Sequence, residues 1–320
     1  MSRGVKQIVG RGLNLISART VVLLYHRIAE LKQDPWGLAV QPKNFGEQLQ
    51  VIRKAGATRL SDAKPSALRP LAPEPSVAVT FDDGYSDNFH YALPLLEKFE
   101  VPATFFITTS YIGKHVPFWW DELQSVILGA NLMERVCVQL GGQPITLAPA
   151  SEERPVEALQ RVHLVVQQLD AMERREAIDT LRRSVRFHEA ADPSDFAMTE
   201  EELQKMAANP IAEIGAHTLT HPKLSALPPE RQFEEIEGSK KYLESLLGTK
   251  VTSFSYPFGA AEHFTQATER LVVALGFQRA CTTETVAFRQ RHSPFRIPRL
   301  YVPNIDGEQF SRWLWSYLRG

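Results

Sequence analysis

Short apolar runs alternate along this chain with longer segments whose apolar residues recur at the spacing of an amphipathic helix. The short runs predict strands at 20–25, 76–81, 103–108, 212–216, 252–256, 278–282 and 296–302. The longer segments predict helices at 43–55, 88–99, 230–247 and 264–275. Strands interleaved with helices predict an α/β fold with a mostly parallel sheet. About seven strands indicate an incomplete or distorted (β/α) barrel, with functional groups at the carboxyl ends of the strands.

Residues 115–200 interrupt this alternation and are predicted to form an inserted subdomain. Within it, RVCVQLGGQPITLA has the pattern of a β-hairpin that turns at two glycines, and 152–187 is charged and helical. Thr199 and Glu202 have the spacing of a capping box that begins the next helix. The predicted order is therefore an N-terminal amphipathic helix, a first barrel part, the insert, a second barrel part and a C-terminal helix, at 1–19, 20–114, 115–200, 201–305 and 306–320.

Both ends of the chain are predicted to be helical. Residues 1–19 carry apolar residues at helical spacing among basic ones, which fits either a helix packed on the barrel or one lying on an anionic membrane surface. In 306–320 a stripe of aromatic and apolar residues indicates packing against the core. The first segment lacks the apolar stretch of a secretory signal, and no apolar run approaches the ~20 residues that span a bilayer.

Charge and cysteine content also bound the function. The 36 basic and 37 acidic residues leave a net charge of −1, so no long-range field points to nucleic acid as a partner. Cys137 and Cys281 are expected to be small buried residues in a reducing compartment, with one disulfide as the alternative. We therefore expect a cytoplasmic protein, with peripheral contact at the inner membrane left open.

The apolar run at 76–81 ends directly in two acids and a glycine, Asp82, Asp83 and Gly84. A buried strand that ends in this way delivers two carboxylates to the rim of the sheet, where α/β folds bind their ligands. Adjacent carboxylates repel one another, so the pair needs a compensating cation or a shared proton. The alternative is a solvated Asp-Gly turn after an ordinary strand.

A pair of histidines, His217 and His221, follows the predicted strand at 212–216. Their i, i+4 spacing points both imidazoles the same way on a helical turn, as in many metal sites. Pro222 disfavours helix at His221 and places the pair in a short turn. Such pairs are more often ordinary histidines. Two histidines and one carboxylate at strand ends, however, form a three-ligand set that leaves positions open for water and substrate. The donors favour Zn²⁺, with Co²⁺, Ni²⁺ and Mn²⁺ as alternatives.

These motifs resemble those of the polysaccharide deacetylases, the NodB-homology group of carbohydrate esterase family 4. TFDDG at 80–84 is similar to the first motif of the family, and HTLTH at 217–221 to the second. SYPFG at 255–259 looks like a variant of the third, and ATFFIT at 103–108 fits the strand after the first. The resemblance covers roughly residues 20–305 and implies the same fold. LLYHRI near the start and the helical insert look like members associated with bacterial surface-polysaccharide assembly.

The resemblance implies a role for each motif residue. Asp82 corresponds to the general base, and the backbone amide of Tyr85 to a donor for the oxyanion. Asp83, His217 and His221 correspond to the metal ligands. The implied reaction is metal-dependent hydrolysis of the N-acetyl amide of an amino sugar, in a bacterial surface glycan or a glycolipid precursor. The alternatives are a deformylase or other amidase acting on a lipid-linked amino sugar, and a homologue that binds glycan without turnover.

The chain departs from the family pattern in two places. Ser255 stands where the third motif usually carries an arginine, and no late Leu-x-Leu-His motif supplies a general acid. Alternate positions on the predicted last strand face opposite ways, so Arg296 and Arg299 lie on opposite faces. We predict that Arg299 reaches the site and orients Asp82 or holds substrate. A surface arginine paired with an acid is the alternative.

Several aromatic and histidine residues are predicted to contact the substrate or support the site. Trp119 and Trp120 either stack on a sugar face or anchor the insert, and His26 ends the first strand at the rim that carries Asp82. The third motif contributes Tyr256, Pro257 and Phe258. The remaining histidines without motif context are predicted to lie at the surface: His90, His115, His163 and His188.

Overall fold

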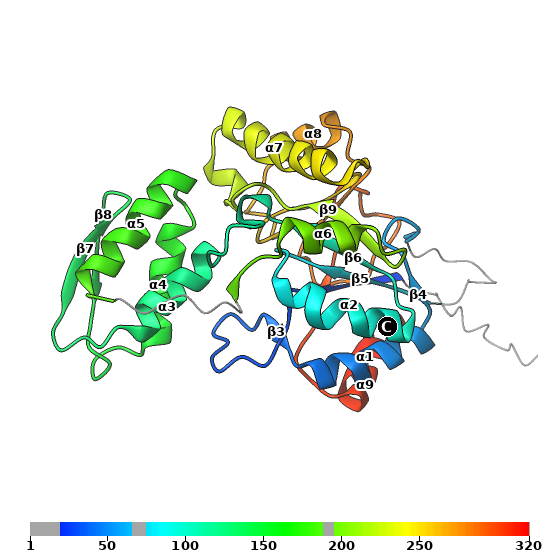
Figure 1. Cartoon of the computed structure of the whole chain (residues 1–320), viewed down its shortest axis with the longest axis horizontal. Helices are drawn as coiled ribbons and strands as arrows, with labels where there is room; N and C mark the ends of the chain where they lie inside the picture. Colours follow the sequence, from blue (N-terminus) through cyan, green and yellow to red (C-terminus); the bar gives the residue numbers. More distant parts are fainter. Residues whose placement is uncertain (1–19, 66–74, 188–194, 320) are drawn as a thin grey trace, which may run out of the picture.

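The computed structural model describes residues 20–65, 75–187 and 195–319. Its main element is an eight-stranded sheet in which every pair of neighbours is parallel. Seven strands follow the order β11-β10-β9-β6-β5-β1-β12, and β4 pairs with β5 off this path. The sheet forms a half-barrel (Figure 1), which confirms the predicted incomplete (β/α) barrel. The strands are β1 (Thr20–Tyr25), β4 (Ala57–Thr58), β5 (Ser76–Phe81), β6 (Ala103–Ile107), β9 (Ala212–Ala216), β10 (Ser253–Ser255), β11 (Arg279–Cys281) and β12 (Leu300–Tyr301).

Helices from the connections pack against the sheet in two groups (Figure 1). One group contains α1 (Pro42–Lys54), α2 (Leu93–Phe99) and α9 (Gly307–Arg319), and the other contains α6 (Glu200–Ala207), α7 (Pro229–Leu247) and α8 (Gln266–Ala274). Three buried side chains of α9 (Phe310, Leu314 and Leu318) attach it to the core. No helix among the described residues is both long and apolar enough to cross a membrane. The predicted helix at 1–19 lies outside the described residues.

Alternation of side chains along β5 carries the first acid of TFDDG into the half-barrel. Val77, Val79 and Phe81 belong to the apolar layer shared with the helices, whereas Ala78 belongs to a second cluster that contains Phe106. Successive side chains of a strand point to opposite faces. Thr80 and Asp82 therefore continue the row that Ala78 begins, on the inner side of the sheet.

Two predicted elements are irregular near a proline, which lacks a backbone donor. The helix expected at 88–99 begins as a π-helix, η1 (Asn88–Ala92), and becomes regular only in α2, with Pro94 in its first turn. The strand expected at 296–302 is reduced to β12 and to an isolated bridge between Ile297 and Cys281, because Pro298 breaks the ladder between them. The helix predicted at 88–99 is confirmed, because η1 and α2 are contiguous, whereas the prediction of a continuous strand at 296–302 was wrong.

The insert forms its own group of elements beside the half-barrel (Figure 1). It contains α3 (Trp119–Gly129), a hairpin of β7 (Val136–Leu140) and β8 (Gln143–Leu147), α4 (Pro155–Val166) and α5 (Ala171–Ser184). The hairpin turns at Gly141 and Gly142, as predicted, and both have positive φ. The helical stretch is divided because Asp170 caps α5. Cys281 is buried as expected, but Cys137 is exposed on the hairpin, contrary to expectation.

Candidate active site

Neighbouring strands supply the polar side chains of the candidate site. His26 follows β1, Asp82 and Asp83 follow β5, His217 follows β9, and Ser255 ends β10. Because parallel strands end at the same edge of a sheet, these residues meet in one place. All of them except His26 are buried.

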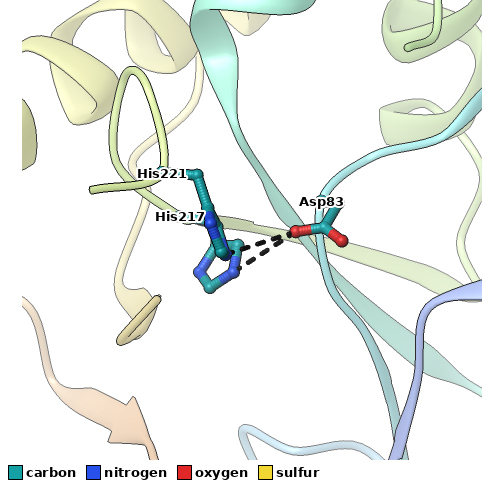
Figure 2. Close-up of side chains that lie close together, drawn as sticks. All are labelled: Asp83, His217 and His221. Carbon is teal, nitrogen blue, oxygen red and sulfur yellow. Dashed lines mark ion pairs between the residues drawn. The ribbon is translucent and has the colours of Figure 1, made fainter. Parts of the chain in front are cut away.

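Three of these side chains converge on one point (Figure 2). Nε2 of His217 and Nε2 of His221 each lie 3.6 Å from Oδ1 of Asp83. Within the described part of the chain, this is the one group of three or more such residues whose donor atoms are close enough to share an ion. Oδ1 of Asp83 is buried and has no hydrogen-bond partner there, which is costly for a carboxylate. A cation would remove that cost, and two nitrogens with one oxygen suit Zn²⁺. The residues therefore fit a divalent metal.

The two histidines are in the form that binds metal. Nδ1 of His217 donates to the carbonyl oxygen of Ser255 at 2.7 Å, which leaves the lone pair on Nε2, the nitrogen that faces Asp83. Burial lowers the pKa of His217, and burial together with His217 lowers the pKa of His221 well below its ordinary value. Both rings are therefore neutral at neutral pH, as a metal ligand must be.

The turns that carry these residues have unusual backbone conformations. Asp83, Thr218, His221 and Phe258 have φ values of 74°, 65°, 55° and 61°, although none is glycine. Gly84 follows with φ of 89°, and a Cβ at this position would lie 3.1 Å from Cδ1 of Ile107. Strained conformations of this kind persist only where the surrounding structure fixes them, as at ligand sites.

The loop that carries the two histidines is held from two sides. Glu235 on α7 accepts hydrogen bonds from the backbone N–H groups of Leu219 and Thr220 at 3.0 and 2.9 Å. Arg174 on α5 is buried and donates to the carbonyl oxygens of Thr220 and His221 at 2.9 and 3.3 Å. The insert therefore contacts the second histidine directly and fixes its backbone.

Arg299 lies inside the half-barrel and forms a bidentate pair with Asp82. Its Nη1 and Nη2 atoms are each 2.7 Å from one oxygen of that carboxylate, and the arginine is fully buried. Nη2 also donates to Oγ of Ser255 at 2.8 Å, and Nε donates to the carbonyl oxygen of Thr282 at 3.0 Å. The arginine beside Asp82 thus comes from the segment before β12. Ser255, at the position expected for an arginine, only forms hydrogen bonds with both members of the pair.

Arg296 lies elsewhere, as the alternation along this segment predicted. Its Nε atom is 2.6 Å from a carboxylate oxygen of Glu269, in a partly exposed pair at the surface. Arg296 and Arg299 therefore form a natural comparison between a surface ion pair and a buried one.

The two adjacent acids have opposite electrostatic environments. Burial raises the pKa of Asp82, but the positive charge of Arg299 and the nearby His217 outweigh burial and lower it from 3.8 to about 2. Burial and the charge of Asp82 raise the pKa of Asp83 well above its ordinary value. Asp82 is therefore a carboxylate at neutral pH, while Asp83 needs a cation beside it to be ionised there.

A cavity of about 400 Å³ opens over this group. Its wall includes the two acids and the two histidines, together with three of the predicted substrate contacts: His26, Trp120 and Phe258. The aromatic surface starts at the candidate metal site, because the ring of Trp120 lies 4.6 Å from that of His221. The site therefore combines a polar floor with aromatic sides.

The other three predicted substrate contacts do not line the cavity, and the packing of Trp119 fits the alternative that it anchors the insert. Tyr256 is fully buried and stacks on Phe264 with ring centroids 4.0 Å apart, and Pro257 is buried beside it. Trp119 packs between His163 and the guanidinium of Arg174. These side chains are already enclosed by the protein, which leaves no face for a sugar.

The cavity wall also contains aromatic residues that the sequence did not mark. His163, predicted to lie at the surface, reaches it from α4, and Trp36 reaches it from the loop between β2 (Arg27–Ile28) and β3 (Ala39–Val40). Tyr301 contributes from β12. Aromatic character was the one local signal for Trp36 and Tyr301, and no local signal marked His163.

Tyr85 is buried beneath the site with its side chain directed towards the insert. Its hydroxyl donates to Oδ2 of Asp121 and accepts from Nε1 of Trp120, both at 2.7 Å. Its backbone N–H has no hydrogen-bond acceptor among the described residues. The backbone amide, rather than the phenol, is therefore the group that remains for a ligand.

Comparison with known proteins identifies the family. The model of a family described as "Polysaccharide deacetylase" matches residues 71–136 and 167–280, more than half of the chain. The chain belongs to this family, whose members are hydrolases acting on carbon–nitrogen bonds. It is similar to a protein of Bacillus subtilis (strain 168) named "Putative polysaccharide deacetylase YxkH", with 24% identity over 304 residues, which are 93% of this chain and 77% of the relative.

Two solved structures have a similar fold. The "Streptococcus pyogenes deacetylase PplD in complex with acetate" gives a TM-score of 0.58 at 17% identity, covering 95% of this chain and 100% of the other. IcaB from Ammonifex degensii gives a TM-score of 0.58 at 20% identity, covering 93% and 97%. At these identities the likeness shows that the deacetylase fold is shared.

Replacing Arg299 is expected to destabilise the protein strongly. Arg299→Ala should lower the free energy of unfolding by about 3–5 kcal/mol, because it leaves Asp82 buried without its partner. Arg296→Ala removes a partly exposed pair at the surface and should cost about 0–1 kcal/mol. Urea unfolding of the metal-free variants measures both values, and equal costs for the two would contradict the buried pair.

The ion pair of Arg299 and Asp82 also makes the stability cost of Arg299→Ala depend on pH. The pKa of Asp82 in the folded protein is below its ordinary value, so its stabilisation is present above pH 3.8 and is lost as the pH falls to about 2. The difference in free energy of unfolding between Arg299→Ala and the parent, measured by urea unfolding, should therefore become smaller as the pH falls from 3.8 to about 2.

Proposed function

We propose that this protein is a metal-dependent N-deacetylase that hydrolyses the N-acetyl amide of an amino sugar in a bacterial surface polysaccharide or its precursor. The observation that carries this proposal is the buried set of Asp83, His217 and His221 beside a carboxylate, Asp82, that Arg299 keeps ionised. Family membership supports the reaction class. The cavity supports a substrate of sugar size, because it is within the usual range for small-molecule sites.

Asp83, His217 and His221 would hold the metal, with Zn²⁺ favoured by the donor types and Co²⁺, Ni²⁺ or Mn²⁺ as alternatives. A divalent metal bound there lowers the pKa of water towards ~7 and polarises a carbonyl group. The tautomer of His217, fixed by the Ser255 carbonyl, and the backbone of His221, fixed by Arg174, hold the two nitrogens in place for this purpose.

Asp82 accepts the proton of the attacking water in this mechanism. Arg299 holds both oxygens of its carboxylate and Ser255 donates to one of them, so the carboxylate cannot rotate away from the cavity. The backbone N–H of Tyr85 would donate to the oxyanion that forms at the amide carbon, an interaction typically worth a few kcal/mol. The proton taken up by Asp82 would return to the leaving nitrogen as the C–N bond breaks, which gives acetate and a free amino sugar. His26, Trp120 and Phe258 line the cavity and would contact the sugar.

Acyl release from a panel of substrates tests the proposal. With Zn²⁺, Co²⁺, Ni²⁺ or Mn²⁺ added, the protein should release acetate from N-acetyl amino-sugar glycans and glycolipids, and a chelator should abolish the release because the metal is essential. Release of formate from N-formyl substrates alone would identify the deformylase alternative. Saccharide binding without release of either acid would identify the non-catalytic alternative.

The metal assignment predicts one divalent ion per chain. His217→Ala and His221→Ala should each lose the metal and the activity because each removes one of three protein ligands. His90→Ala, which changes a half-exposed histidine paired with Glu202, should keep both. Metal analysis and circular dichroism make the comparison, and full metal content in both ligand variants would rule out the assignment.

The base assignment predicts a different result for Asp82→Asn. This variant should retain the metal but lose about 10²–10⁴-fold in turnover, since removal of a general base typically costs that much. Metal content and kcat are the two measurements. Turnover within a few-fold of the parent would mean that another group takes the proton.

A further inference from the structure

α4 of the insert brings a histidine into the cavity wall. The ring of His163 stacks on Trp119, with centroids 5.1 Å apart and planes 13° from parallel, and it contacts Trp36 at 4.7 Å. Phe258, another wall residue, lies 6.0 Å away. Packing against these rings fixes the imidazole at the boundary between the insert and the cavity.

The nitrogen atoms of this imidazole have no hydrogen-bond partner in the described part of the protein, although the ring is largely enclosed. Burial, with a smaller effect of Arg174, lowers its pKa to about 4, so the ring is neutral and offers one N–H donor and one acceptor. A few such polar groups on a mostly aromatic wall are what orients a ligand in a small-molecule site. Sugar hydroxyl groups can donate to the one nitrogen and accept from the other.

The neighbours of His163 suit the rest of a sugar. Trp36 and Trp120 also line the cavity, and their rings offer apolar surface to the C–H groups of a pyranose. Trp120 additionally contacts His221, so this aromatic surface extends from the candidate metal ligands to α4. A saccharide whose amide lies at the metal site would therefore have His163 within the same cavity.

His163 also lies in a part of the chain that the family model does not match. The family model matches residues 71–136 and 167–280 and leaves out the hairpin and α4 between them. A residue in this segment therefore lies outside the part of the chain that shows the family membership. It is in the right place to distinguish the substrate of this protein from those of its relatives.

We propose that His163 is a substrate-recognition residue, which hydrogen-bonds a hydroxyl group of the N-acyl amino sugar while Trp36 and Trp120 pack on the sugar ring. This inference rests on the proposed function, because it assumes a saccharide in the cavity. In this proposal the insert selects the sugar, and the residues at the strand ends carry out the reaction.

His163→Phe tests the hydrogen bond, because phenylalanine keeps the ring that stacks on Trp119. The variant should fold normally, retain its metal and raise KM about 10-fold for N-acetylglucosamine oligomers with little change in kcat, since a binding hydrogen bond is lost. Leu164→Ala, on the exposed side of α4, is the matched control and should behave as the parent. Substrate analogues that each lack one hydroxyl group identify the partner of His163. For one hydroxyl position, its removal should raise KM of the parent protein by the same factor, and it should cause no further rise with His163→Phe.

Unchanged KM in a folded, metal-loaded His163→Phe variant would overturn the proposal, and so would a loss confined to kcat. If the parent releases no acetate, the proposed function is rejected, but the recognition role of His163 can still be tested by binding. Calorimetric binding of N-acetylglucosamine oligomers to the parent and to His163→Phe then decides the recognition role. Weaker binding to the variant supports that role, and equal binding, or no binding to either protein, overturns it.

Discussion

The bidentate pair of Arg299 and Asp82 is the interaction on which the site depends. Two adjacent carboxylates inside a half-barrel cannot both be ionised without a cation, because burial and mutual repulsion oppose it. Arg299 supplies that cation to Asp82 from the segment before β12, which lies two strands from β5 in the sheet, and thereby joins the ends of these two strands. Ser255 continues the connection, since its Oγ contacts the pair and its carbonyl oxygen orients His217. The proposed base and a candidate metal ligand are therefore positioned by one network.

This arrangement also divides the work between the two acids. Arg299 fixes the carboxylate of Asp82 but lowers its pKa to about 2, which makes Asp82 a weak base. A weak base deprotonates water effectively only when that water is itself made acidic, and a divalent metal has this effect. Asp83, whose pKa is raised by burial and by Asp82, is the acid that needs a positive neighbour. The electrostatics of the protein alone therefore favour a cation between Asp83 and the histidines.

The sequence allowed the central residues to be predicted because they follow strands whose ends must meet. Arg299 was found from the alternation along a strand and from the need for a cation beside Asp82. The aromatic contacts were predicted less well. Trp119 and Tyr256 look like sugar-binding residues in sequence, but nothing local reveals that other side chains cover them. His163 and Trp36 reach the cavity through the packing of the insert and a loop, which depends on tertiary contacts. The change of helix type near Pro94 and the interruption of the last strand at Pro298 could have been predicted, because each proline removes a backbone donor.

The insert is therefore more than an addition to the barrel. Through Arg174 it fixes the backbone of His221, through Asp121 it binds the phenol of Tyr85, and through Trp120 and His163 it forms part of the cavity wall. These contacts differ in how freely they can change. Arg174 and Asp121 hold residues of the shared motifs, so replacing them would disturb the chemistry. His163 makes ring contacts with Trp119, Trp36 and Phe258 but holds none of the candidate metal ligands by a hydrogen bond within the described residues, so a change at this position of α4 should disturb the strand ends less. Function on a common fold is changed most easily at such positions, where a side chain lines the cavity without holding the reacting groups in place.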